Sequence, residues 1–230
     1  MLFGGIQKST LIDYPGKIGC VLFFSGCNFH CPYCHNPELA KGQAVDPWTE
    51  QAAYNFLEKR KGFLGGVVIS GGEPTLQPDV VRICRTIRQM GYPIKLDTNG
   101  SRPKVLEELI SGGLVDYVAM DIKTIPEYYP RYIQKDCNVD AITASIRLIK
   151  TSCISYEFRT TCIRPLIDTH IMKQICMSIQ GAALYVLQRF SLSHVLSPDF
   201  FDKNEYSITE SDLQGYRTIA EKWVGSCMIR

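Results

Sequence analysis

A chain of 230 residues can bury a substantial core, and its 45% hydrophobic and 21% charged residues are ordinary for a soluble globular protein. The formal net charge of +2 shows no sign of the concentrated basic excess that nucleic-acid-binding domains carry. The opening residues lack the long apolar segment of a secretory signal, and the longest apolar runs are far too short to cross a bilayer, so we expect one cytoplasmic domain that contacts neither membrane nor nucleic acid.

Six short runs of apolar or β-branched residues predict strands. Most of them are almost continuously apolar, which is typical of strands that helices cover on both faces. The predicted strands span residues 18–24, 67–70, 94–97, 117–122, 156–162 and 184–187.

Segments with helical periodicity separate these runs. The clearest spans residues 103–111, where Pro103 suits the first helical position and Gly112 ends the helix. Between them, Leu106 and Leu109 belong to a single apolar stripe. Residues 192–206 read as a long loop that contains Pro198. The full set of predicted helices is 48–61, 78–90, 103–111, 139–151, 169–180 and 209–224.

The alternation of strands and helices predicts parallel β/α crossovers. Six strands are too few for a complete eight-stranded barrel, which leaves a doubly wound open sheet or a curved, partly open barrel. In both folds, functional side chains gather at the carboxyl ends of the strands.

The chain has ten cysteines, and three of them cluster directly after the first predicted strand. In a chain of this length without an export signal, clustered cysteines indicate a metal or catalysis rather than disulfides. The cluster follows the spacing C-x₃-C-x₂-C, from Cys27 through Cys31 to Cys34. We expect the dispersed cysteines to be mostly small buried hydrophobes. These are Cys20, Cys84, Cys137, Cys153, Cys162, Cys176 and Cys227.

Two kinds of metal site suit this spacing. Three thiolates on a [4Fe–4S] cluster leave one iron open, because fully ligated clusters use four cysteines. Zinc requires a further ligand or a bound water, and His30 or His35 is placed to supply the ligand. The cysteine spacing alone leaves both metals open.

Polar residues also follow the other predicted strands. The second strand ends in GGEP, with Gly71, Gly72 and Glu73, and no G-K-[ST] follows that would make it a phosphate loop. Carboxylates can hold an ammonium group, and Lys or Arg can hold a carboxylate, so the joint set suits a zwitterionic ligand. The third strand supplies Asp97, Thr98 and Asn99, the fourth Asp121 and Lys123, the fifth Arg159 and Thr161, and the sixth Gln188 and Arg189.

The motifs CNFHCPYC and GGEP, in this order after the first and second strands, resemble the signatures of radical S-adenosylmethionine (SAM) enzymes. The combination favours a [4Fe–4S] cluster over zinc. The resemblance implies an α/β fold, a partial (β/α)₆ TIM-like barrel of the radical SAM type. It implies a single domain over residues 1–230, with a core at about 15–190 and a C-terminal loop and helix at about 191–230.

The resemblance also implies roles for individual residues. Cys27, Cys31 and Cys34 would ligate the cluster, and the amino and carboxylate groups of SAM would bind the fourth iron. The implied SAM contacts are Tyr33 at adenine, Gly71, Gly72 and Glu73 at the amino group, Asp97, Thr98, Asp121 and Lys123 around the ribose and carboxylate, where a monovalent cation can also bind, Arg159 near the carboxylate, and Gln188, which stands where some relatives carry a histidine.

A narrower resemblance joins GGIQKSTLIDYPGK, CPYCHNPEL, KLDTNG, DYVAMDIK and YEFRTT to the anaerobic ribonucleoside-triphosphate reductase activating proteins, which are glycyl-radical-enzyme activases. It implies an oxidoreductase that cleaves SAM reductively and uses the 5′-deoxyadenosyl radical to form a glycyl radical on a large partner enzyme, with flavodoxin or ferredoxin as reductant. Two alternatives remain. One is a radical SAM enzyme for another glycyl radical enzyme, a small molecule or RNA, and the other is a zinc- or cluster-binding interaction protein without enzymatic activity.

Overall fold

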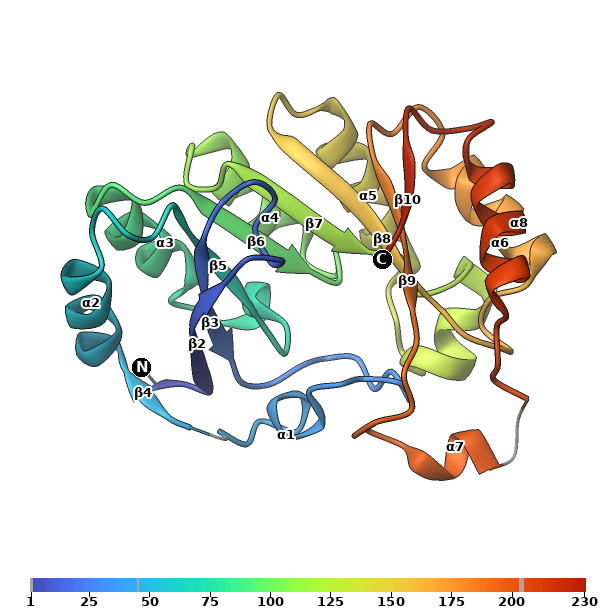
Figure 1. The fold of residues 1–230 in the computed structure, drawn as a ribbon, viewed down its shortest axis with the longest axis horizontal. Helices are drawn as coiled ribbons and strands as arrows, with labels where there is room; N and C mark the ends of the chain where they lie inside the picture. Colours follow the sequence, from blue (N-terminus) through green and yellow to red (C-terminus); the bar gives the residue numbers. More distant parts are fainter. Residues whose placement is uncertain (1, 45, 203–204) are drawn as a thin grey trace.

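The fold is built on an eight-stranded sheet (Figure 1). The computed structural model describes residues 2–44, 46–202 and 205–230. Its six central strands run parallel, lie side by side in chain order and coincide with the six predicted strands. They are β3 (Gly19–Phe24), β5 (Gly66–Gly71), β6 (Ile94–Thr98), β7 (Tyr117–Asp121), β8 (Ser155–Cys162) and β9 (Tyr185–Arg189).

The order of the strands distinguishes between the two predicted architectures. A doubly wound sheet reverses its strand order at a switch point, whereas here each strand lies beside the one before it. With crossovers of one hand, this order places every connecting helix on the same face of the sheet. The fold is therefore the partial barrel, which stays open between the edge strands β2 (Gly5–Thr10) and β10 (Cys227–Ile229).

Both edge strands were absent from the prediction. Strand β2 pairs antiparallel with β3, and β10 extends the parallel run beyond β9. The middle of β2 is exposed and polar, and β10 is only three residues long, so neither shows a clear apolar pattern. Strands β1 (Leu2–Phe3) and β4 (Trp48–Thr49) form a separate antiparallel pair.

All six predicted helices are present, with ends that differ by a few residues. They lie along the outer side of the sheet, whereas α1 (Pro37–Ala40) and α7 (Pro198–Asp202) lie at the lower edge of the view in Figure 1. No helix within the described residues is long and apolar enough to cross a membrane. The six are α2 (Glu50–Lys59), α3 (Val80–Gln89), α4 (Pro103–Ser111), α5 (Val139–Thr151), α6 (Thr169–Ser178) and α8 (Glu210–Ala220).

Short helical turns and side-chain caps complete the connections. Side chains of Thr49, Asn138 and Asp168 accept backbone N–H groups at the starts of α2, α5 and α6, which satisfies donors that a helix start leaves free. Thr209 and Asp212 form a capping box at the start of α8. The shorter turns are Pro74–Leu76, Pro126–Tyr128 and Tyr129–Ile133.

The two faces of the sheet differ in chemistry. Leu22, Ile69 and Leu96 belong to the large buried core that includes residues of the outer helices. Because side chains alternate along a strand, their neighbours Val21 and Val68 point into the barrel, where they form a small separate cluster. Towards the carboxyl ends of the strands the inner face becomes polar, and there it forms the wall of a cavity.

Candidate functional site

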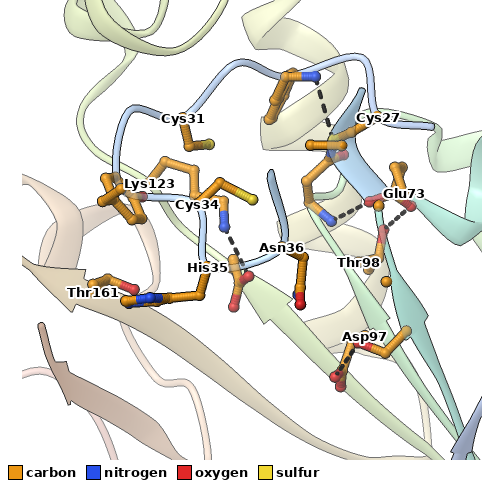
Figure 2. A pocket seen from close by; sticks show the side chains of 18 of the residues that line it. Cys27, Cys31, Cys34, His35, Asn36, Glu73, Asp97, Thr98, Lys123 and Thr161 are labelled. Atoms are coloured by element: carbon orange, nitrogen blue, oxygen red, sulfur yellow. Dashed lines mark hydrogen bonds and ion pairs between the residues drawn. The ribbon is translucent and has the colours of Figure 1, made fainter. Parts of the chain in front are cut away.

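A cavity of about 270 Å³ lies at the carboxyl ends of the parallel strands (Figure 2). The three clustered cysteines and all the residues predicted to contact SAM line it. Asn99 and Thr161, also identified at strand ends, are part of the same lining. Arg189 does not line the cavity. It follows Gln188 on β9, and neighbouring side chains of a strand point to opposite faces, so Arg189 points outwards and bonds Glu210 on the surface at 2.8 Å.

The cysteine loop, residues 25–36, brings three thiols to one side of the cavity. The thiol of Cys27 accepts the backbone N–H of Phe29 at 3.4 Å and lies 3.9 Å from the amide nitrogen of Asn99. Burial raises the pKa of Cys27 to about 11 and the pKa of Cys31 to about 12. Without a metal these two groups are therefore neutral thiols at pH 7, and a bound metal would be needed to hold them as thiolates.

The glycine pair after β5 packs against the start of the cysteine loop. Gly71 has φ of +115°, and a Cβ there would lie 2.3 Å from the carbonyl oxygen of Phe24. A Cβ on Gly72 would lie 2.2 Å from the carbonyl oxygen of Gly26. Because such distances are too short for any side chain, only glycines allow this approach. The N–H of Glu73 then donates to Gly26 at 2.8 Å, which links the two loops.

The carboxylate of Glu73 is turned towards the chain itself. It is 1% exposed and accepts hydrogen bonds from Thr98 Oγ1 at 2.8 Å and from the backbone N–H groups of Asn99 at 2.6 Å and Thr75 at 3.0 Å. Burial raises the pKa of Glu73, while the hydrogen bonds from Thr75, Asn99 and Thr98 act in the opposite direction. The structure therefore gives Glu73 a visible role in joining loops around the cavity.

Charged side chains from three neighbouring strands form the polar floor of the cavity. Arg159 donates from Nε to Asp121 at 2.7 Å and reaches Asp97 from a terminal nitrogen at 3.4 Å. Lys123 bonds the second oxygen of Asp121 at 2.8 Å. Burial opposes ionisation of both carboxyls, but Arg159 with Lys95 lowers the pKa of Asp97, and Arg159 with Lys123 lowers that of Asp121. Both aspartates are therefore ionised at neutral pH.

The ring of Tyr33, which belongs to the cysteine loop, also lines the cavity. The ammonium group of Lys123 lies 5.9 Å from the ring centre of Tyr33. The hydroxyl of Tyr33 is buried and finds no hydrogen-bond partner within the described part of the chain. A buried hydroxyl in the lining of a cavity is suited to a ligand that supplies the missing partner.

The first part of the predicted loop 192–206 lies against the cysteine loop. We call residues 191–202 the strap; Lys203 and Asn204 lie outside the described residues. The N–H groups of Leu196 and Ser197 donate to the carbonyls of Cys34 and Pro32, both at 3.1 Å. The strap is anchored by an aromatic cluster in which Phe201 stacks on Phe190 with ring centres 5.0 Å apart. It therefore covers the segment that carries the third cysteine.

The two histidines beside the cysteines have different positions. His35 lines the cavity and bonds the backbone oxygen of Ser193 on the strap at 3.2 Å. His30 is exposed and bonds Gln134 at 2.9 Å. The sequence prediction missed the lining residues Phe29, Asn36, Ala40 and Ser70. It also missed Lys95, which is buried and paired with Asp97.

The arrangement fits an iron–sulfur cluster better than a single zinc ion. Residues 2–44, 46–202 and 205–230 contain no group of three or more Cys, His, Asp or Glu side chains close enough to hold one metal ion. A four-iron cluster spreads its ligands over several irons, so three thiols around a wider space match it. The ionised floor and the unpartnered Tyr33 hydroxyl leave polar groups for a second ligand beside it.

Comparisons with known proteins agree on one family. The family model of the radical SAM superfamily matches residues 21–173. "Putative glycyl-radical enzyme activating enzyme MJ1227" of Methanocaldococcus jannaschii is 35% identical over 240 aligned positions, which cover 100% of this chain and 95% of that protein. The pyruvate formate-lyase-activating enzyme of Clostridium pasteurianum is 33% identical over 127 residues. That match covers 53% of this chain and 52% of the relative, so the chain spans about half the length of that relative.

Solved structures share the fold at low sequence identity. A radical SAM methyltransferase from Sphaerobacter thermophilus superposes with a TM-score of 0.66 at 13% identity, covering 96% of this chain and 68% of that one. A domain of a pyruvate-formate lyase-activating enzyme from Bacteroides vulgatus gives a TM-score of 0.57 at 18% identity, covering 72% and 99%. At these identities the similarity concerns the architecture alone.

Proposed function

The chain belongs to the radical SAM superfamily, and on this premise we propose that it generates a glycyl radical on an anaerobic ribonucleoside-triphosphate reductase. Similarity to a protein named as a glycyl-radical enzyme activating enzyme extends over the whole chain, which supports the activase class. The choice of reductase rests on the motifs GGIQKSTLIDYPGK, CPYCHNPEL and KLDTNG.

One observation carries the proposal: the three thiols and the charged floor meet in a single cavity at the strand ends. A [4Fe–4S] cluster and SAM, when bound there, supply the one-electron chemistry that removes a hydrogen atom from the substrate. Cys27, Cys31 and Cys34 would hold the cluster. The backbone N–H of Phe29 and the side-chain amide of Asn99 lie next to the sulfur of Cys27. They are placed to raise the reduction potential of the cluster, because hydrogen bonds to the ligand sulfurs have that effect.

The remaining lining residues would hold SAM by its charges. Arg159 and Lys123 face the cavity, where a guanidinium and an ammonium group side by side suit a carboxylate. The hydroxyl of Tyr33 would find its missing partner on the ligand. Glu73 would act on the amino group of SAM only through a lone pair that its own hydrogen bonds leave free, while it keeps the surrounding loops in position.

The test uses two candidate partners side by side. The cluster-loaded protein, reduced with flavodoxin or ferredoxin, is incubated anaerobically with SAM and either the large subunit of an anaerobic ribonucleotide reductase or a pyruvate formate-lyase. Electron paramagnetic resonance (EPR) then detects the doublet of a glycyl radical. We expect it on the reductase, and a reductase whose target glycine is replaced by alanine is the control.

A second candidate function has its own support, since the C. pasteurianum relative is named for pyruvate formate-lyase. A doublet on the lyase alone would replace the proposed partner with that one. Formation of 5′-deoxyadenosine without a doublet on either protein would place the substrate in another class.

A further inference from the structure

Lys95 is a buried lysine that the proposed cluster and SAM contacts do not use. It is 2% exposed and lies on β6, two residues before Asp97, so both side chains project from the same face of the strand. Its ammonium group contacts Oδ1 of Asp97. Lysines are almost never buried to this degree unless a partner compensates their charge. Asp97 is that partner, and we therefore ask what the buried pair does for the cavity above it.

The pair is one end of a row of alternating charges across β6, β7 and β8. Arg159 bridges the two aspartates, and Lys123 ends the row on the far oxygen of Asp121. The row reads Lys95, Asp97, Arg159, Asp121, Lys123, which gives three cations to two anions. The row itself therefore carries one more positive than negative charge.

Every carboxylate oxygen in the row already accepts a donor from this chain. At Asp97, Lys95 and Arg159 reach Oδ1, and Ser70 donates to Oδ2 at 3.0 Å. At Asp121, Arg159 occupies Oδ1 at 2.7 Å and Lys123 occupies Oδ2 at 2.8 Å. A dissolved metal cation would have to share three of these oxygens, Oδ1 of Asp97 and both oxygens of Asp121, with ammonium or guanidinium groups, which repel it. Only Oδ2 of Asp97 is shared with a neutral donor, the hydroxyl of Ser70.

Lys95 differs from the other two cations in its position. Arg159 and Lys123 line the cavity, whereas Lys95 lies behind Asp97 and outside the lining. If Lys95 lost its charge, Asp97 would draw Arg159 away from Asp121, since the contact of Arg159 with Asp97 is now the longer one, at 3.4 Å against 2.7 Å. Without the charge of Lys95, the row would also have no surplus positive charge.

We propose that Lys95 is a positioning residue whose ammonium group serves as the built-in counter-ion of Asp97. It keeps Arg159 on Asp121, leaves Arg159 and Lys123 available to the carboxylate of SAM, and removes the need for a metal cation at this site. This inference rests on the proposed binding of SAM in the cavity. It differs from the expectation, drawn from the family resemblance, that a monovalent cation binds beside these aspartates.

The test measures SAM binding rather than turnover. Calorimetry on the anaerobic, cluster-loaded protein gives the Kd of SAM in a buffer with choline as the sole added cation and again after addition of KCl. The variants are Lys95→Met, which has similar length and no charge, and Lys95→Arg, which keeps the charge. Lys173→Met, at an exposed position on α6, is the matched control.

We expect the wild type, Lys95→Arg and Lys173→Met to bind SAM equally well in both buffers. Lys95→Met should bind at least about tenfold more weakly in choline, which corresponds to about 1.4 kcal/mol, and should partly recover in KCl. Thallium(I) nuclear magnetic resonance adds a direct readout: Tl⁺ alone should bind to Lys95→Met and not to the wild type.

Several results would overturn the inference. Wild-type binding that requires KCl, or a Tl⁺ signal on the wild type, would show that a metal cation is needed and would leave the proposed function standing. Folded Lys95→Arg that binds as weakly as Lys95→Met would show that the charge is not the cause. If Lys95→Met does not fold, the wild type and Lys95→Arg still decide the matter. A wild type that binds no SAM in either buffer overturns the proposed function together with this inference.

Discussion

The carboxylate of Glu73 accepts the backbone N–H of Asn99 at 2.6 Å, which fastens the loop after β5 to the loop after β6. The backbone N–H of Glu73 donates in turn to Gly26 at 2.8 Å, at the start of the cysteine loop. A single residue thus joins three loops of the cavity. The groups around its carboxylate are all donors, so a carboxylate fits this position better than any side chain that carries a donor of its own.

Glu73→Gln should therefore destabilise the protein even without a cofactor. Both carboxylate oxygens of Glu73 accept hydrogen bonds, and in glutamine one of them would be replaced by an NH₂ group. The donor that now bonds that oxygen would then be buried without an acceptor. We expect a loss of about 1–3 kcal/mol in the free energy of unfolding. Urea unfolding of the metal-free protein under reducing conditions measures it. Glu107→Gln, on the exposed side of α4, should be neutral, and an equal loss in both variants would contradict the explanation.

Replacing any one of Cys27, Cys31 or Cys34 with alanine should abolish the cluster while the fold stays largely intact. The cluster has only these three protein ligands for its four irons, so the loss of one thiol leaves a second iron without a protein ligand. Iron and sulfide content after anaerobic reconstitution provide the measurement, with circular dichroism as the check on folding. Cys153→Ala removes an exposed cysteine and should keep the wild-type iron content. Full iron content in Cys31→Ala would show that the ligand assignment is wrong.

Arg159→Lys should weaken SAM binding. A guanidinium can donate to Asp121 and Asp97 at the same time, whereas an ammonium group is a single point that cannot span both. We expect the Kd of SAM to rise by about tenfold or more, equivalent to about 1.4 kcal/mol. Arg88→Lys, at an ion pair with Asp116 on the surface, should leave the Kd unchanged. Equal affinity of Arg159→Lys and the wild type would argue against a charged floor that binds SAM.

Phe201→Ala should loosen the strap and expose the cysteine loop. Phe201 is 5% exposed and packs against Phe190 and Tyr206, and replacing a buried phenylalanine with alanine costs about 3–5 kcal/mol of packing. We expect the visible absorbance of the cluster to bleach faster in air, without a change in initial iron content. Phe63→Ala, at a position that is 71% exposed, is the matched control. Identical bleaching rates would mean that the strap does not protect the cluster.

The repeating part of the fold could be predicted because its signals are local. Buried strands between helices are continuous apolar runs, and helices such as Pro103–Ser111 carry their start and stop residues in the sequence. The elements that were missed depend on distant partners. Strand β10 is three residues long and exists because it pairs with β9, and the strap has defined contacts only because the cysteine loop supplies acceptors for Leu196 and Ser197.

The site was predictable to a similar extent. The fold rule gathers strand ends at one edge, and this placed the cysteines, Asp97, Asp121 and Arg159 in a single cavity. Lys95 was missed, although its spacing of two residues from Asp97 was a signal that both share a face. Glu157 is buried beside Arg230 at 3.1 Å, and no local pattern predicts a pair that lies 73 residues apart in the chain.

The most direct test of the central claim is an anaerobic experiment on the wild-type protein. It is reconstituted with iron and sulfide, reduced with dithionite and mixed with SAM, and the EPR spectrum is recorded while 5′-deoxyadenosine is quantified. The account predicts a cluster signal that changes on addition of SAM, together with 5′-deoxyadenosine. A protein that retains zinc, gives no such signal and cleaves no SAM would contradict it.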